Sequence, residues 1–426
     1  MTILDSIYAH ETGARKINPR LDTDLVCDVA IIGGGLTGVS TALTLAKRGY
    51  DVALCEAYSL GTGGSGRNGG HVCQGWPNDF HHISRQVSPS DADLAWQAGM
   101  GAVDLLTKNV ADYDIDCDLR FGYLHAALHK GQMRDLDIMQ TEWEARGYDH
   151  FTRLDNPNAL AKHIGSDAYV GALHDSGCGH IQPLKYLLGL ATAAQAAGAR
   201  IYENTPITRL VTKPEKFLTT ADGKTIQPRI IVLCGNAYLG DLALPHMRRR
   251  LAQVTSSILA TKPLSDNMIK AILPTGVAVS DCNAALNYYR IDANGRMIFG
   301  GRASYTNVQI GNLERDLRHR MEAVFPMLAG ADIEQIWSGK IGITVNRIPH
   351  FGRTNDDVYF VQGFSGHGVA LTGQAGHIIA DAISGNGAVF DVMTQLKHLP
   401  FPGGIFRTPA LALGMAWYKL RDRLKL

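Results

Sequence analysis

The sequence lacks the features typical of membrane, disulfide-bonded and nucleic-acid-binding proteins. No apolar run reaches the length of a membrane-spanning helix, about eighteen residues, and the N-terminal stretch MTILDSIYAHETGARK has no apolar centre of the signal-peptide kind. The seven cysteines are odd in number and form no CxxC pair, so the sequence predicts neither a disulfide framework nor a zinc site. A net charge of +1 provides no field to attract nucleic acid or an acidic membrane. We therefore expect a cytoplasmic protein with neither kind of partner.

Internal repeats and low-complexity segments are also absent, and what remains is an ordinary globular composition. With 426 residues, of which 45% are hydrophobic, the chain is long enough for two domains with a large core. Two histidine pairs, His81 with His82 and His125 with His129, have no acidic or cysteine partner at ligand spacing, so we expect no metal site.

The most informative segment is residues 27–56, CDVAIIGGGLTGVSTALTLAKRGYDVALCE. Its two apolar runs, 29–32 and 52–55, predict buried parallel strands around an amphipathic helix. Gly33, Gly35 and Gly38, with Leu36 and Thr37 between them, have the spacing of a dinucleotide-binding turn, and Glu56 stands where a carboxylate accepts a ribose hydroxyl. An ordinary βαβ turn with incidental glycines is the alternative. The agreement of strand, helix, second strand and acid favours the dinucleotide site.

A second glycine-rich loop, GTGGSGRNGG at 61–70, follows soon after this acid. It resembles the loop by which flavoproteins of the D-amino-acid oxidase and sarcosine oxidase superfamily approach their flavin. Residues 358–383 predict a strand, a glycine turn and a long helix, an arrangement that directs N–H groups at a flavin ring oxygen. The resemblance therefore implies FAD. The further FAD-binding residues that it implies are Ser65, Gly66, Arg67, Asn68, Gly69, Gly70, Gly235, Asn236, Gly363, Ser365, Gly366, His367, Gly368 and Val369.

The same resemblance implies an α/β fold with a Rossmann-like FAD-binding domain and a sheet-based substrate domain. We expect the FAD-binding domain to be discontinuous and to comprise 22–85, 165–242 and 336–392. Residues 86–164, which we predict to be mostly helical, and 243–335, with strands and one helix, then form the substrate domain, and 393–426 form a C-terminal tail. Within 243–335, the turn Asp292-Ala-Asn-Gly295 between alternating residues predicts a hairpin.

Within the superfamily the chain most closely resembles the γ-glutamylputrescine oxidoreductases. The residues that carry this resemblance are 64–70, 233–241, 281–283 with 288–290, 362–369, and the tail segments 400–404 and 418–424. The resemblance implies oxidation of an amine C–N bond to an imine that hydrolyses to an aldehyde, with oxygen or another acceptor taking the electrons, in polyamine or related amine catabolism. The alternatives are an oxidase or dehydrogenase of another secondary or N-alkyl amine or amino acid, and a flavin-binding subunit without turnover.

Departures from relatives bear on the substrate and on the flavin linkage. Sarcosine oxidases have a substrate-binding lysine where Ala370 stands, and amino-acid oxidases have an arginine shortly after a Trp-x-Gly that here precedes Lys340 and Ile341. A carboxylate beside the flavin would therefore lack a partner, which favours a substrate whose amine end is an uncharged alkyl chain. Relatives with a covalent flavin use a cysteine within the segment that matches 339–344, or a histidine at the position of Asn68, so we expect non-covalent FAD.

Five residues are candidates for the catalytic or substrate site: His367, His71, Tyr288, Arg290 and Lys340. His367 either faces the flavin or bonds the backbone at the start of a helix. His71, together with Trp76, either lines the pocket or packs in the core. Strand alternation places Tyr288 and Arg290 on one face, where they contact substrate or serve in cross-strand packing. Arg290 or Lys340 would receive a distal carboxylate of the substrate.

Overall fold

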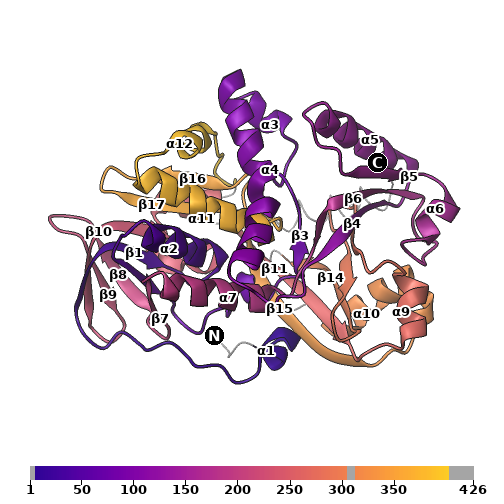
Figure 1. Ribbon diagram of the computed structural model, residues 1–426, viewed down its shortest axis with the longest axis horizontal. Helices are drawn as coiled ribbons and strands as arrows, with labels where there is room; N and C mark the ends of the chain where they lie inside the picture. The colour runs from indigo at the N-terminus through magenta and orange to yellow at the C-terminus, as the bar shows by residue number, and fades with distance from the viewer. Residues whose placement is uncertain (1–4, 305–311, 403–426) are drawn as a thin grey trace.

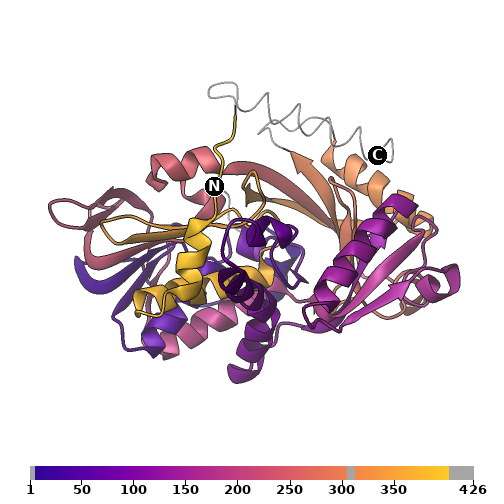
Figure 2. The same cartoon turned by 90° about the horizontal axis from the view of Figure 1, so that it is seen from above.

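The fold consists of two sheets that lie side by side along the long axis of the molecule (Figure 1). The computed structural model describes residues 5–304 and 312–402. Helices cover both sheets, which gives the predicted mixed α/β class. The view from above shows the same two halves, and the last part of the described chain, in yellow, lies on the first half (Figure 2).

The first sheet has the strand order β16-β17-β10-β1-β2-β7, with β9 beside β10 and β8 beside β9. β1, β2, β7, β10 and β17 pair in parallel, as the dinucleotide motif predicts, and β16 is antiparallel to β17. The strands are β1 (Leu25–Ile32), β2 (Val52–Cys55), β7 (Arg200–Tyr202), β8 (Ile207–Val211), β9 (Phe217–Thr220), β10 (Thr225–Leu233), β16 (His350–Arg353) and β17 (Val358–Gln362).

Both faces of this sheet are buried, which explains why β1 and β2 are continuous apolar runs. Val29 and Ile31 belong to the core that also contains residues of the helices α2 (Leu36–Lys47), α7 (Pro183–Ala196) and α11 (Val369–Ile383). Ala30 and Ile32 belong to the core on the opposite face. The long helix α4 (Pro89–Asp112) packs on α11 and stands between the two halves of the molecule (Figure 1).

The second sheet has the order β15-β11-β14-β13-β12-β4-β6-β3, with β5 beside β6, and is antiparallel except for β4 and β12. Its strands are β3 (His71–Val72), β4 (Arg120–Ala127), β5 (Phe151–Leu154), β6 (Gly171–His180), β11 (Ala252–Thr261), β12 (Ala278–Asp281), β13 (Tyr288–Ile291), β14 (Met297–Ser304) and β15 (Ile333–Ile343). β13 and β14 form the predicted hairpin, since Ile291 pairs with Met297. On one face, Tyr289 stacks on Phe299 in a core that includes α10 (Leu313–Val324).

The remaining helices complete the described chain. They are α1 (Ile7–Thr12), α3 (His81–Ser84), α5 (Lys130–Glu144), α6 (Pro157–Ala161), α8 (Pro245–Arg250), α9 (Asp266–Ile272) and α12 (Ala388–Gln395), with 3₁₀ turns η1 (Gly64–Gly66), η2 (Asn236–Tyr238), η3 (Gly240–Leu242) and η4 (Pro326–Leu328). Of the helices in 5–304 and 312–402, none has both the length and the apolar character needed to cross a membrane.

The strand pairing departs from the expected division of the chain at several places. β3, β6 and most of β15 fall in segments that the sequence assigns to the FAD-binding domain, yet they pair in the second sheet. The prediction of a mostly helical 86–164 overlooks β4 and β5. β5 is short, and the pairing of β4 with β6 skips Gly122, where a bulge interrupts the alternation. Of the predicted tail 393–426, residues 403–426 lie outside the described residues, and 393–395 are the last turn of α12.

Candidate active site

The first glycine turn connects β1 to α2 with very little space around it. Gly33 has φ +109°, a conformation that side chains disfavour, and a Cβ atom there would lie 3.0 Å from the backbone of Cys234 on the neighbouring strand connection. A Cβ atom on Gly38 would lie 2.0 Å from the Gly33 carbonyl oxygen, so the helix packs directly on the turn. A Cβ atom on Gly35 would approach the Ser65 hydroxyl to 2.9 Å. The glycine spacing therefore corresponds to three separate close approaches.

Glu56 is held at the end of β2 by the backbone of this turn. Its Oε2 accepts the Gly34 N–H at 2.8 Å and its Oε1 accepts the Tyr58 N–H at 3.0 Å. Burial raises the pKa of the Glu56 carboxyl, and these backbone donors partly oppose the rise. The carboxylate thus has a fixed orientation at the edge of the cavity described below.

The second glycine loop is fixed by its own side chains. The Ser65 hydroxyl accepts the Leu36 N–H at 3.0 Å, which joins the loop to the start of α2. Asn68 Nδ2 donates to the carbonyls of Gly64 and Ser65, and its Oδ1 accepts the Gly70 N–H at 2.8 Å. Asn68 therefore organises the loop at the position where covalent relatives carry a histidine.

Arg67 connects the same loop to β15. Its Nε donates to the Thr62 carbonyl at 2.8 Å and its Nη1 to the Ser338 carbonyl at 3.3 Å. The Arg67 carbonyl in turn accepts the indole N–H of Trp337 at 2.9 Å. The loop therefore bridges the first sheet and the second.

A third segment reaches the same place from the far end of the chain. The Gly363 N–H donates to Asn236 Oδ1 at 3.0 Å, which ties the turn after β17 to the turn after β10. Gly363 and Gly366 have φ values of +84° and +91°, and Ser365 has φ +52°, so this turn needs its glycines to bring the backbone to α11.

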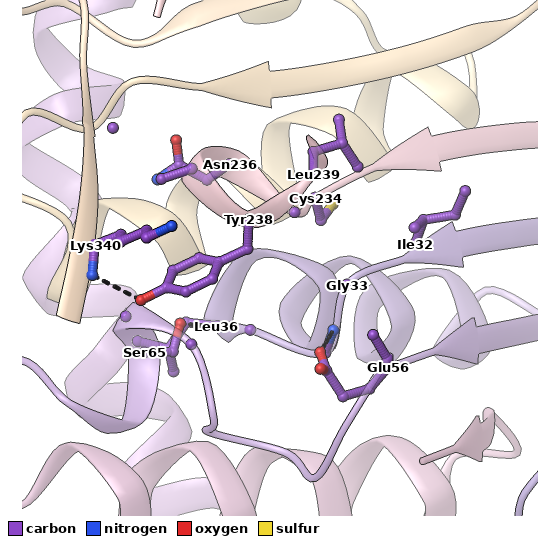
Figure 3. A pocket seen from close by; sticks show the side chains of 18 of the residues that line it. Ile32, Gly33, Leu36, Glu56, Ser65, Cys234, Asn236, Tyr238, Leu239 and Lys340 are labelled. Atoms are coloured by element: carbon purple, nitrogen blue, oxygen red, sulfur yellow. Dashed lines mark hydrogen bonds between the residues drawn. The ribbon is translucent and has the colours of Figure 1, made fainter. Parts of the chain in front are cut away.

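These three segments line a cavity of about 730 Å³, with Glu56 and Lys340 on opposite sides (Figure 3). The size suits a large cofactor. Of the predicted FAD-binding residues, those that line it are Gly33, Gly35, Leu36, Glu56, Ser65, Asn68, Gly235, Asn236, Ser365, Gly366, Gly368 and Val369. Lys340 is the one catalytic candidate among the lining residues of the described chain, and its side chain points into the cavity (Figure 3).

The remaining predicted FAD residues lie close to these lining residues along the chain. They are Thr37, Gly38, Gly66, Arg67, Gly69, Gly70, Gly363 and His367, and none is among the lining residues of the described chain. Gly66 lies where a Cβ atom would be 2.3 Å from the Gly61 carbonyl oxygen, and Gly70 has φ +77°. The packing of these glycines shapes the loop, while the neighbouring residues form the cavity wall.

His367 and Arg290 both bond the backbone. His367 Nε2 lies 2.8 Å from the Gln74 carbonyl oxygen, which corresponds to the backbone alternative of the sequence analysis, and burial lowers the pKa of its imidazole. The Arg290 side chain is almost fully buried and donates to the Gly69 carbonyl at 2.7 Å and to the Tyr8 hydroxyl at 3.3 Å. Arg290 therefore supports the second glycine loop from β13.

Tyr288 and His71 pack beside that loop. The Tyr288 hydroxyl lies 3.0 Å from the Ser256 hydroxyl, and its ring makes an edge contact with His71 at 5.5 Å between centroids. Trp76 is buried and donates its indole N–H to the Ala95 carbonyl at 2.8 Å, as core packing predicts. In the described part of the chain, no group of three His, Cys, Asp or Glu side chains is arranged to hold a metal.

Two functional features are absent from the sequence predictions. The Tyr238 hydroxyl accepts the Lys340 N–H at 2.7 Å and its side chain lies across the cavity (Figure 3). Glu203 is fully buried, pairs with Arg15 and accepts the Leu60 N–H at 2.6 Å. Tyr238 belongs to segment 233–241, which carries the family resemblance and could have indicated this residue. No local sequence pattern indicates the pairing of Glu203 with Arg15.

Comparison with known proteins decides the family. The model of the FAD dependent oxidoreductase family matches residues 28–382. The chain belongs to this family. It is 36% identical to the gamma-glutamylputrescine oxidoreductase of Escherichia coli (strain K12) over 98% of both chains. It is also 36% identical to a probable oxidoreductase, OrdL, of Haemophilus influenzae, over 93% of this chain and 92% of the relative.

Solved structures show the same fold. The glycine oxidase of Geobacillus kaustophilus superposes with a TM-score of 0.72 at 22% identity, over 89% of this chain and 100% of the other. An L-proline dehydrogenase from P. horikoshii gives a TM-score of 0.71 at 22% identity, over 85% and 94%. By its family the protein is an FAD-dependent oxidoreductase. Its cavity fits that cofactor, because the glycine turn leaves no room for side chains and Glu56 presents an oriented carboxylate.

Proposed function

We propose that the enzyme oxidises the primary amine end of γ-glutamylputrescine or of a closely related acylated amine. The observation that carries this proposal is the character of the cavity near α11. Ala370 is buried at the start of that helix, and Ile341 and Phe364 present apolar side chains to the cavity. A substrate carboxylate against these apolar side chains would be desolvated, at a cost that an uncharged alkyl amine would not incur. The 36% identity to a gamma-glutamylputrescine oxidoreductase supports the same substrate class.

The residues of the chain would hold FAD and orient the amine. Glu56 and the turn at 33–38 would hold the nucleotide part, and the 363–369 turn with Asn236 would lie near the ring system. When bound, FAD supplies hydride acceptance from the carbon next to the amine nitrogen. The chain supplies an enclosed, largely apolar site that favours the unprotonated amine, and the imine product hydrolyses in water to an aldehyde. We further propose that FAD is bound non-covalently.

Lys340 is the residue that we propose to receive the distal carboxylate of the substrate. Arg290, the other candidate, is almost fully buried and already donates to Gly69 and Tyr8. Lys340 lines the cavity, and its side chain points into it (Figure 3). A charge-assisted pair there would contribute about 1.5–3 kcal/mol, or about ten- to hundredfold in kcat/KM.

Initial rates on γ-glutamylputrescine, putrescine, spermidine, sarcosine and glycine under one set of conditions test the substrate. We expect γ-glutamylputrescine to exceed putrescine by about ten- to hundredfold in kcat/KM, with sarcosine and glycine lower still. Sarcosine or glycine as the best substrate would overturn the proposal. If another acylated or N-alkyl amine is best, the chemistry stands and the substrate assignment changes.

A variant comparison tests the role of Lys340. Lys340→Gln should lower kcat/KM for γ-glutamylputrescine by about tenfold and leave that for putrescine within about twofold, because putrescine has no carboxylate. Lys262→Gln is the matched control, since Lys262 is exposed and pairs with Asp332 on the surface. An equal loss on both amines would show that Lys340 supports the cavity and does not read the carboxylate.

A further inference from the structure

A row of polar aromatic side chains lies on the second sheet where it approaches the cofactor cavity. His71 from β3 and His125 from β4 flank Tyr123, with ring centroids 5.5 Å and 4.9 Å from the tyrosine ring. His71 Nδ1 lies 3.3 Å from the Tyr123 hydroxyl oxygen. Tyr288 closes the row from β13, with its ring edge on His71. We call His71, Tyr123, His125 and Tyr288 the imidazole row.

Two nitrogen atoms of this row are buried without a hydrogen-bond partner in the described part of the chain. They are Nε2 of His71 and Nε2 of His125. A buried polar atom left unpaired costs about 1–3 kcal/mol, so two of them in one cluster require an explanation. A ligand that supplies complementary groups is the explanation that also accounts for their position.

The pKa values of both imidazoles are lowered, which favours their neutral forms. Burial lowers the pKa of His71 well below its usual range, and the nearby positive charge of Arg290 lowers it further. Burial also lowers the pKa of His125, and the negative charge of Asp175 partly opposes this shift. The row therefore has no cation to pair with a carboxylate. It offers two neutral imidazole nitrogens and two aromatic rings, which suits a neutral group with N–H donors on an alkyl chain.

The row borders the cofactor cavity through two short connections. Asn68 lines the cavity, and the next residue, Gly69, lies so close to the row that a Cβ atom would be 2.7 Å from Tyr288 and 3.3 Å from His71. Gly366 and Gly368 also line the cavity, and His367 between them bonds the Gln74 carbonyl, three residues after His71. A ligand on the row would therefore lie next to the cofactor.

We propose that the imidazole row is the subsite for the amine end of the substrate, with Nε2 of His71 and of His125 accepting hydrogen bonds from its N–H groups. This inference rests on the proposed oxidation of an amine. In this arrangement the proton of His71 is on Nδ1, and this N–H donates a hydrogen bond to the Tyr123 oxygen. Nε2 is then left as an acceptor. Tyr123 and Tyr288 lie against the alkyl chain.

Paired substitutions separate hydrogen bonding from packing. His125→Phe removes the acceptor, whereas His125→Gln keeps an amide oxygen near the position of Nε2. We expect His125→Phe to raise the Kd for γ-glutamylputrescine by about tenfold and His125→Gln by about threefold or less. The Kd is read from the change in the flavin absorption spectrum under anaerobic conditions, before reduction. His71→Phe and His71→Gln should give the same order.

His398→Gln is the matched control. His398 is also buried, and neither of its ring nitrogens has a hydrogen-bond partner among residues 5–304 and 312–402, but it packs on His350, close to Arg250, away from the row. We expect the Kd of His398→Gln for γ-glutamylputrescine to stay within about twofold of the wild-type value. Flavin content and melting temperature of every variant are measured beside Kd, and a loss in both with unchanged Kd overturns the subsite.

The outcomes for the subsite and for the proposed function are distinct. If γ-glutamylputrescine perturbs the wild-type flavin spectrum but is never oxidised, the proposed function fails, while the Kd values still decide the subsite. If another amine is the substrate, the same comparison is made with it. Equal Kd values for the Phe and Gln variants, or no perturbation by any of the five amines, would overturn the subsite.

Discussion

Removal of the Glu56 carboxylate should weaken FAD binding without unfolding the chain. The two backbone N–H groups that hold it, from Gly34 at 2.8 Å and Tyr58 at 3.0 Å, belong to the turn and to the loop after β2. Both groups lie at the cavity edge, where water replaces the carboxylate in Glu56→Ala. The carboxylate is already oriented, so a ribose hydroxyl would gain its hydrogen bond without the entropy of ordering the side chain.

The magnitude follows from the value of one charge-assisted hydrogen bond. Such a bond contributes about 1.5–3 kcal/mol, which corresponds to an increase in the Kd for FAD of about ten- to hundredfold in Glu56→Ala. Glu56→Gln keeps the shape and one acceptor oxygen but loses the charge, so we expect an increase of about tenfold or less. The order of the two variants is therefore part of the prediction.

Titration of the apoprotein into FAD, followed by quenching of flavin fluorescence, measures these constants. Glu215→Gln is the control, because Glu215 is an exposed acid near the same sheet and bonds Gln227 on the surface. A Kd for Glu56→Ala within about twofold of wild type would refute the assignment of this carboxylate to the cofactor. A large loss in Glu215→Gln would instead indicate a general effect of surface charge.

Three other measurements have expected outcomes. Burial raises the pKa of the cavity-lining Cys234 thiol to about 12, so no thiolate is available for flavin attachment, and acid precipitation should leave a colourless pellet; a yellow pellet would contradict this. Gly38→Ala places a methyl group 2.0 Å from a backbone oxygen and should lower the melting temperature by several degrees. Gly373→Ala, whose methyl group meets no described atom within 4 Å outside its own helix and chain neighbours, should preserve or raise it. Hydrogen bonds from Arg15 and backbone N–H groups outweigh burial and lower the pKa of Glu203, so its stabilisation is present above the unfolded value of 4.5 and is lost as pH falls through the folded value. Glu203→Gln should therefore cost about 3 kcal/mol at pH 7 by urea unfolding, and this difference should narrow below pH 4.5; a constant difference would exclude the linkage.

The first sheet could be predicted from the sequence because its central strands are buried on both faces. Continuous apolar runs at 29–32 and 52–55 and the glycine spacing between them are local signals, and they correspond to β1, β2 and the start of α2. β6 gave no such signal. Its sequence GALHDSGCGH contains glycines that the sheet requires, since a Cβ atom on Gly179 would lie 2.1 Å from the Arg120 carbonyl oxygen.

The cavity wall was predictable where one short segment makes it, and not where distant segments meet. The residues of the two glycine loops follow from their own spacing. The bonds of His367 to Gln74, of Arg290 to Gly69 and of Glu203 to Arg15 join positions that no local pattern relates. His367 and Arg290 do not line the cavity, and their polar atoms bond the backbone carbonyls of Gln74 and Gly69.

The second glycine loop adjoins both the cofactor cavity and the imidazole row. Asn68 lines the cofactor cavity, Gly69 is held by Arg290, and His71 begins the imidazole row, all within four residues. A substrate carboxylate on Arg290 would have to displace the Gly69 carbonyl and would release this loop from β13. The guanidinium therefore serves as an internal support, which leaves Lys340, whose side chain points into the cavity, as the cation that we propose for a distal carboxylate.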